Sequence, residues 1–251
     1  MAKQFITSIL YLFLLVSIAL AEEEKLKVGF IASFSGSAQI YGDAARAGFE
    51  LALDELGRDW IDVVYEDDQF LPAKTVAAFR KLTNSNKIDL VISVGSTPSK
   101  AVAPLAEAKG IPLIAWASDR TVSRGRPHIV RSYPSGFAEG AIAANEAIRR
   151  GFNNFSVFIS HNDYAVSLEN GFTCTTPKES IVIREEVSGE INDFKPLLLR
   201  AKRRGANQFV LCLNPGKTGL LAKQAAELNI QSSLFGCEYL HDKDEIKTAE
   251  G

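Results

Sequence analysis

Short apolar runs alternate with longer amphipathic segments along almost the whole chain. In the first half, apolar runs of strand length predict strands at residues 26–32, 61–65, 89–94 and 112–116. Apolar residues at helical spacing predict helices between them, at residues 39–57, 73–84 and 98–109. In the first of these helices, the stripe expected to face the core is Ala44, Gly48, Leu51 and Ala52. Repeated strand–helix units with short links indicate a mostly parallel sheet covered by helices on both faces.

A loop-rich segment at residues 119–135 interrupts this alternation. Its three arginines fit a solvated basic loop better than an anion-binding patch, and they are Arg120, Arg124 and Arg126. The alternation then resumes, with helices predicted at residues 136–150, 164–172, 193–204 and 217–228. Strands are predicted at residues 155–160, 180–187, 207–213 and 233–237, and residues 238–251 show little periodicity. The sequence therefore predicts an α/β fold of two lobes, residues 22–134 and 135–251, each with a parallel, doubly wound sheet.

The N-terminus has the layout of a cleavable secretory signal. Lys3 supplies a positive start, residues 9–20 are apolar apart from Ser17, and the small-x-small pattern Ala19-Leu20-Ala21 follows. A membrane anchor is the alternative, but so short an apolar run would barely cross a bilayer. We therefore predict that residues 1–21 are a signal peptide and that the mature chain is exported to the periplasm.

Two classes of function find no support in the sequence. Lys and Arg total 28 against 30 Asp and Glu, so no basic excess suggests a nucleic-acid partner. No G-x-S-x-G or H-E-x-x-H motif occurs, and the "NPGKTG" stretch has Leu211 where a phosphate loop requires glycine. We predict no metal, no cofactor and no enzymatic activity. An exported enzyme that uses His161 or Asp163 is the alternative.

The chain has three cysteines, Cys174, Cys212 and Cys237. In an oxidising compartment one pair could form a disulfide and leave the third thiol free. Cys212 and Cys237 lie near the ends of predicted strands and could be neighbours. Three separate buried thiols are an equally good interpretation, because free cysteine is often buried.

Polar and aromatic residues gather in the loops at the predicted strand ends. In an open α/β sheet, ligands bind outside the carboxyl ends of the strands. Hydroxyls and helix N-terminal N–H groups accept an anion, and a carboxylate receives an ammonium group. No arranged nucleophile and base accompany them, so these residues suit a small polar ligand. They are Tyr41, Ser96, Thr97, Ser118, Asp119, Tyr164 and Glu238.

Several stretches, in order from residue 26 to residue 238, carry a resemblance to a known family. The most distinctive are "KVGFIASFSGSAQIYGDAARAGFELALDEL" and "DLVISVGSTPSKAVAPLAEAKGIPLIAWAS", followed by "HIVRSYPSGFAEG", "NDYAVSLENGF" and "LFGCE". The chain resembles the type I periplasmic solute-binding proteins of the branched-chain amino-acid (leucine/isoleucine/valine) group, which serve ABC transporters. The resemblance implies two lobes that close on a small solute, and an inner-membrane ABC permease as partner. A ligand-binding module of a sensor or receptor with the same fold is the alternative.

The resemblance also implies roles for the candidate residues. Tyr41 would pack on the ligand, and Tyr164 would be an aromatic contact from the second lobe. Ser96 or Thr97 would bind the ligand's α-carboxylate, with help from the backbone near Ala117 and Ser118. Glu238, in "LFGCE", would receive the α-ammonium group.

Two features depart from the family pattern. Asp119 stands where the family has a threonine that faces the α-carboxylate, and an aspartate there would repel a carboxylate unless Arg120 compensates or Ser118 serves instead. The ligand could therefore also be an amide or a polyamine-like cation. The second feature is length, because the family's chain returns to complete the first lobe. We accordingly expect a fragment with an incomplete second lobe and hinge, and an exposed apolar face.

Overall fold

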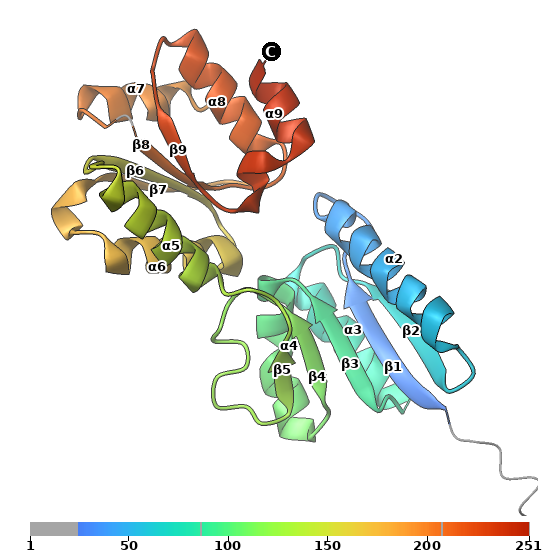
Figure 1. Cartoon of the computed structure of the whole chain (residues 1–251). Helices are drawn as coiled ribbons and strands as arrows, with labels where there is room; N and C mark the ends of the chain where they lie inside the picture. The colour runs from blue at the N-terminus through green and yellow to red at the C-terminus, as the bar shows by residue number, and fades with distance from the viewer. Residues whose placement is uncertain (1–24, 86, 207, 251) are drawn as a thin grey trace, which may run out of the picture.

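The computed structural model describes residues 25–85, 87–206 and 208–250. The predicted signal peptide lies outside these residues. Two α/β units follow one another along the chain, each built on its own sheet (Figure 1). Every pairing between neighbouring strands is parallel. The predicted fold of parallel, helix-covered sheets is therefore confirmed.

The first unit has a five-stranded sheet in the order β2-β1-β3-β4-β5. Its strands are β1 (Leu26–Ala32), β2 (Ile61–Asp67), β3 (Leu90–Val94), β4 (Leu113–Trp116) and β5 (Ile129–Arg131). Its helices are α2 (Gln39–Leu56), α3 (Pro72–Ser85) and α4 (Ser96–Lys109). Phe79, Leu82 and Val91 are fully buried in the core that α3 and α4 form with the sheet. The strand order places the ends of β1 and β3 side by side, where the α2 and α4 loops begin.

The second unit has a four-stranded sheet in the order β7-β6-β8-β9. Its strands are β6 (Phe155–Ser160), β7 (Ile181–Val187), β8 (Gln208–Cys212) and β9 (Ser233–Gly236). Its helices are α5 (Gly136–Arg149), α6 (Asp163–Thr175), α7 (Lys195–Arg203), α8 (Lys217–Glu227) and α9 (Lys243–Glu250), with short 3-10 turns η1 (Lys178–Ser180) and η2 (Glu238–His241). Every residue of β6 is buried, as expected of a central strand covered on both faces.

The chain passes from the first sheet to the second between Arg131 and Gly136. The Arg131 guanidinium donates to the carbonyls of Ala117, at 3.0 Å, and Pro134, at 3.2 Å. It also contacts the carbonyl of Tyr133. One side chain therefore ties this connection to the end of β4. Among the described residues, no helix combines the length and the apolar character needed to span a bilayer.

Two elements lie where the sequence analysis expected none. β5 falls inside the predicted loop, because three residues are too few to show an alternating pattern. α9 occupies most of the segment without periodicity, and its Ile246 remains 44% exposed. The helix docks through a polar contact instead: the buried Glu245 carboxylate accepts the N–H groups of Gly216, at 2.5 Å, and Gly219, at 2.6 Å. A hydrophobic pattern cannot reveal such docking.

The predicted core stripe of α2 is wrong. Gly42, Ala45 and Leu53 are buried instead, and Leu51 is 59% exposed. Gly42 explains this rotation of the helix, since a Cβ there would lie 1.9 Å from the carbonyl oxygen of Ser33. The helix crosses the end of β1 at its glycine, and that contact decides which face is covered.

Candidate functional site

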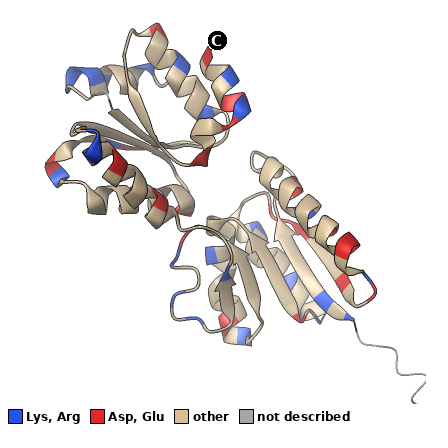
Figure 2. Cartoon of the chain, in the orientation of Figure 1, with Lys and Arg blue, Asp and Glu red and all other residues tan. Residues whose placement is uncertain are grey.

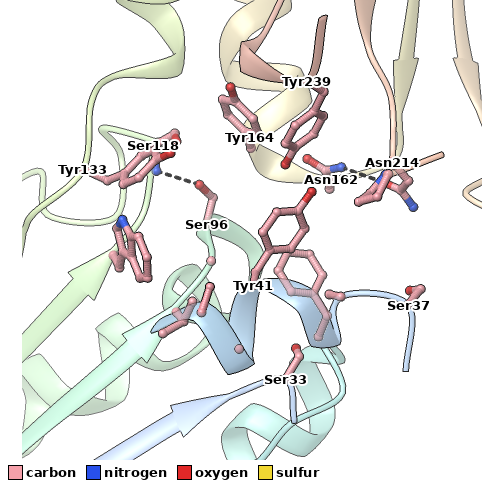
Figure 3. A pocket seen from close by; sticks show the side chains of 18 of the residues that line it. Ser33, Ser37, Tyr41, Ser96, Ser118, Tyr133, Asn162, Tyr164, Asn214 and Tyr239 are labelled. Carbon is pink, nitrogen blue, oxygen red and sulfur yellow. Dashed lines mark hydrogen bonds between the residues drawn. The ribbon is translucent and has the colours of Figure 1, made fainter. Parts of the chain in front are cut away.

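A cavity of about 190 Å³ lies between the two units. Both contribute to its wall, the first through the loops after β1, β3 and β4 and the second through the loops after β6, β8 and β9 (Figure 3). The wall is rich in aromatic rings, which are Tyr41, Phe70, Trp116, Tyr133, Tyr164 and Tyr239. The cavity is therefore suited to a small ligand with an apolar body.

Charge in this wall is confined to one carboxylate. Glu238 is the one Asp, Glu, Lys, Arg or His among the described residues that line the cavity. Elsewhere, Figure 2 shows basic and acidic residues intermixed over the helices of both units. An acidic group within an aromatic wall favours a ligand with a positive end, because a carboxylate and an ammonium group form charge-assisted hydrogen bonds.

Glu238 is held in place by tyrosine hydroxyls. It begins η2, directly after β9, and its Oε2 lies 2.5 Å from the Tyr164 hydroxyl at the start of α6. Its Oε1 accepts the Tyr133 hydroxyl at 3.3 Å. Burial, and then the charge of Glu238, raise the pKa of Tyr133 to about 12. Burial likewise raises the pKa of Tyr164. Both phenols therefore stay protonated and orient the carboxylate as donors.

Tyr41 forms part of a contact between the units. Its ring stacks on Tyr239, with centroids 5.9 Å apart and planes inclined by 26°. Tyr239 in turn meets Tyr164 edge-on at 6.4 Å. Burial raises the pKa of Tyr41, so its phenol remains neutral. The three rings lie together in Figure 3 and link α2 to α6 and η2.

The hydroxyl oxygen of Ser96 accepts two hydrogen bonds from the protein backbone. This first residue of α4 accepts the backbone N–H groups of Ser118, at 2.9 Å, and Asp119, at 3.1 Å. The backbone donors expected to assist in holding a carboxylate are therefore occupied. The serine hydroxyl keeps one hydrogen to donate to a ligand.

The sequence pattern of the family described as periplasmic binding protein matches residues 25–251. The chain belongs to this family. The resemblance predicted from the sequence is thereby confirmed, and the two-sheet architecture agrees with it.

Relatives of this periplasmic binding protein include Leu/Ile/Val-binding protein homolog 6 of Brucella melitensis, which is 26% identical over an alignment of 229 residues. That match covers 88% of this chain and 58% of the relative. A solute binding protein of R. palustris in complex with 4-hydroxybenzoate has a TM-score of 0.79 at 23% identity, covering 90% of this chain and 66% of that one. LivJ of Streptococcus pneumoniae in complex with isoleucine has a TM-score of 0.78 at 24% identity, and the match covers 90% of this chain and 68% of that one. The chain thus spans about 58% of the length of the first of these relatives.

Of the predicted contact residues, the structure places Tyr41, Ser96, Ser118, Tyr164 and Glu238 around this one cavity. It places Thr97, Ala117 and Asp119 outside its wall. Thr97 Oγ1 accepts the backbone N–H of Asp163 at 3.0 Å, which links α4 to α6. Ala117 is buried and gives its carbonyl to Arg131. Thr97 therefore supports the contact between the units, and Ala117 supports the connection that follows β5.

Asp119 turns away from the cavity because it has local partners. Its carboxylate accepts the N–H and the hydroxyl of Thr121, both at 2.8 Å, and pairs with Lys100 at 3.3 Å. Lys100 also lies 2.5 Å from Asp163 of α6. Arg120 stacks on Phe137 at 3.9 Å. The expected repulsion between Asp119 and a ligand carboxylate therefore has no geometric basis.

Several residues around the cavity were missed by the sequence analysis. Asn162 and Asn214 follow β6 and β8, and the rule of strand ends could have found both of them. Tyr133 follows β5, a strand that the sequence pattern does not predict, and Tyr239 directly follows the predicted Glu238. Glu139, in the first turns of α5, lies 2.7 Å from the Tyr164 hydroxyl. Its pKa is raised, chiefly by burial and further by the charge of Glu238.

The residues of the enzyme alternative do not meet in this cavity. His161 is exposed and contacts Glu186, and Asp163 pairs with Lys100. Within the described ranges, no group of three His, Cys, Asp or Glu side chains is arranged to hold a metal ion.

All three cysteines are free thiols, so the structure contains no disulfide between them. Cys212 and Cys237 are buried and lie at the ends of the paired strands β8 and β9, close enough for a hydrogen bond. Burial, and then that bond, raise the pKa of the Cys212 thiol. Cys174 is exposed, which corrects the interpretation of three buried thiols.

Proposed function

We propose that this protein is the extracytoplasmic substrate-binding component of an ABC uptake system and that it holds a small amino-acid-like solute between its two units. The observation that carries this proposal is the position of Glu238, a lone carboxylate in an aromatic cavity shared by both units. Such a group receives an ammonium ion, and the rings exclude water from the rest of the ligand. The proposed role is binding, without catalysis.

Related proteins support the proposal and suggest two classes of ligand. Some are named for branched-chain amino acids, and several solved structures contain a benzoate, such as 4-hydroxybenzoate. A benzoate would bring its negative charge near Glu238, and the described wall offers no Lys, Arg or His to neutralise it. An amino acid brings an ammonium group to Glu238 and an apolar side chain to the rings. We therefore favour the amino-acid class.

Transport follows from closure in this proposal. A solute that contacts both units stabilises their closed arrangement, because it binds that arrangement more tightly than an open one. The closed protein would then be recognised by an inner-membrane permease, in the periplasm.

The test is a binding titration of the exported chain with aliphatic and aromatic amino acids, benzoates and the corresponding primary amines. Glu238→Gln keeps the shape of the side chain and removes its charge. One charge-assisted hydrogen bond contributes about 1.5–3 kcal/mol, so amino-acid affinity should fall at least about tenfold. Glu179→Gln, on the exposed η1 turn, is the matched control and should bind like the wild type. Tight binding of a benzoate that Glu238→Gln leaves unchanged would contradict the proposal.

A further inference from the structure

The Tyr164 hydroxyl lies between two carboxyl groups. Its oxygen is 2.7 Å from Glu139 Oε2 and 2.5 Å from Glu238 Oε2. A tyrosine hydroxyl has one hydrogen and can donate it to one acceptor at a time. If both carboxyls were ionised, one contact would place two oxygens face to face without a hydrogen between them. The geometry therefore requires a further proton in this group of three side chains.

Glu139 is the place for that proton. Glu238 faces the cavity and is also an acceptor for Tyr133, so it has two hydroxyl donors. Glu139 has Tyr164 as its hydrogen-bond partner and lies farther from the cavity. The two distances agree with this assignment, because a hydroxyl approaches a carboxylate to about 2.5–2.7 Å and a neutral oxygen to about 2.7–2.8 Å. Protonated Glu139 thus donates to Tyr164, which donates to Glu238.

We propose that Glu139 stores a proton in the ligand-free site and releases it to solvent when a cationic ligand group binds beside Glu238. Glu139 is then a positioning residue that acts on the ligand through Tyr164 and Glu238. The exchange balances: the ammonium group brings one positive charge into the site, and one proton leaves the Glu139 carboxyl. The ammonium group then replaces Tyr164 as a donor to Glu238, the Tyr164 hydrogen turns to the ionised Glu139, and the close contact between Tyr164 and Glu238 opens. The proposal rests on the proposed function for the identity of the ligand, but the stored proton does not depend on it.

The surroundings of Glu139 fix the direction of the effect. The titratable groups that face it are Tyr164 on α6, Tyr133 ahead of α5, Glu238 on η2 and the Cys212 thiol at the end of β8. In the described structure no basic group acts on Glu139. Burial, and then the charge of Glu238, raise the pKa of Glu139 above the usual glutamate value of 4.5. A bound cation favours the ionised form, so cation binding must expel the proton.

The binding experiment uses three probes of one shape: leucine, isoamylamine and isoamyl alcohol. Calorimetric titrations in two buffers of different ionisation enthalpy count the protons released per ligand. We expect release with leucine and isoamylamine, none with the alcohol, and none from Glu139→Gln, whose amide can still donate to Tyr164. Affinity of the wild type for the amine should rise with pH above 4.5, by at most about tenfold per pH unit. Equal proton release from wild type and Glu139→Gln would overturn the proposal.

A ligand-free experiment separates this inference from the proposed function. Because the folded protein holds the Glu139 proton more tightly than the unfolded chain, the wild type should lose unfolding free energy relative to Glu139→Gln as pH rises from 4.5. Glu179→Gln should show no such divergence. In the wild type, carbon NMR of glutamate carboxyls should show a signal that titrates above 4.5 and that Glu139→Gln removes. If no probe binds but that signal is present, the proposed function fails and the stored proton stands. If every glutamate titrates at or below 4.5, the stored proton is refuted.

Discussion

Gly140→Ala would add one methyl group where α5 and α6 cross. A Cβ at Gly140 would lie 1.9 Å from the carbonyl oxygen of Leu168 and 2.8 Å from the backbone nitrogen of Phe172. The crossing is reciprocal, since a Cβ at Gly171 of α6 would lie 1.9 Å from the carbonyl oxygen of Phe137. These neighbours are helix backbone and cannot rotate aside. The two helices must therefore move apart.

The size of the effect follows from two opposing contributions. Overpacking of a tight contact costs about 1–3 kcal/mol, and a backbone clash belongs at the upper end. Alanine in a helix interior gains about 1 kcal/mol over glycine. Gly48→Ala in α2 has the second contribution alone, because its Cβ would meet nothing within 4 Å. We expect a net loss of about 2 kcal/mol for Gly140→Ala and a gain of up to about 1 kcal/mol for Gly48→Ala.

The assay is urea unfolding followed by circular dichroism, with both variants measured beside the wild type. The difference between the variants, about 3 kcal/mol, isolates the cost of the crossing because the helix-propensity contribution cancels. Separation of the helices should also draw Glu139, the neighbour of Gly140, away from Tyr164 and weaken the proton release. If Gly140→Ala and Gly48→Ala unfold at the same urea concentration, the close crossing of α5 and α6 is refuted.

Two further predictions concern the second unit. Glu245→Gln should lower the unfolding free energy of the second unit by about 1–2 kcal/mol, because the negative charge at the start of α8 is lost. The measurement is a urea titration, and an unchanged midpoint would contradict the docking described for α9. Cys174 should react rapidly with a thiol reagent in the native protein, whereas Cys212 and Cys237 should react only after unfolding, since burial raises the pKa of the Cys212 thiol and keeps it protonated. If more than one thiol per chain reacts rapidly with the reagent, this prediction of accessibility is wrong.

Much of the fold could be predicted because the central strands are apolar runs bounded by polar loops. The stretch "FSVFIS" of β6 is an example, and its burial on both faces follows from its composition. Prediction failed where position depends on contacts between distant residues. The buried face of α2 is determined by the close approach of Gly42 to the Ser33 carbonyl. The position of α9 is determined by the hydrogen bonds of Glu245 to backbone N–H groups at the start of α8. Neither contact leaves a periodic trace.

The candidate site was partly predictable for the same reason. Residues directly after parallel strands lie at one edge of their own sheet, so Ser96 and Ser118 lie at that edge of the first sheet and Glu238 at that edge of the second. All three line the cavity between the two units. The backbone of Asp119 lies near the end of β4, as the rule predicts, but its side chain turns away from the cavity and accepts hydrogen bonds from Thr121. The spacing Asp-x-Thr is typical of such a turn, in which the aspartate accepts the backbone N–H two residues on. Local hydrogen bonding therefore has to be considered before a strand-end residue is assigned to a ligand.

Glu139 could not be reached by that rule, since it lies within a helix rather than at a strand end. Its approach to Tyr164 depends on Gly140 and Gly171, whose missing side chains let two helix backbones touch. With ordinary residues at both positions, the helices would stand farther apart and the carboxyl would not reach the phenol. The glycines of the crossing thus shape the charge of the cavity as well as the packing of the unit. A change at either glycine should alter how the site holds its proton without touching any residue that lines the cavity.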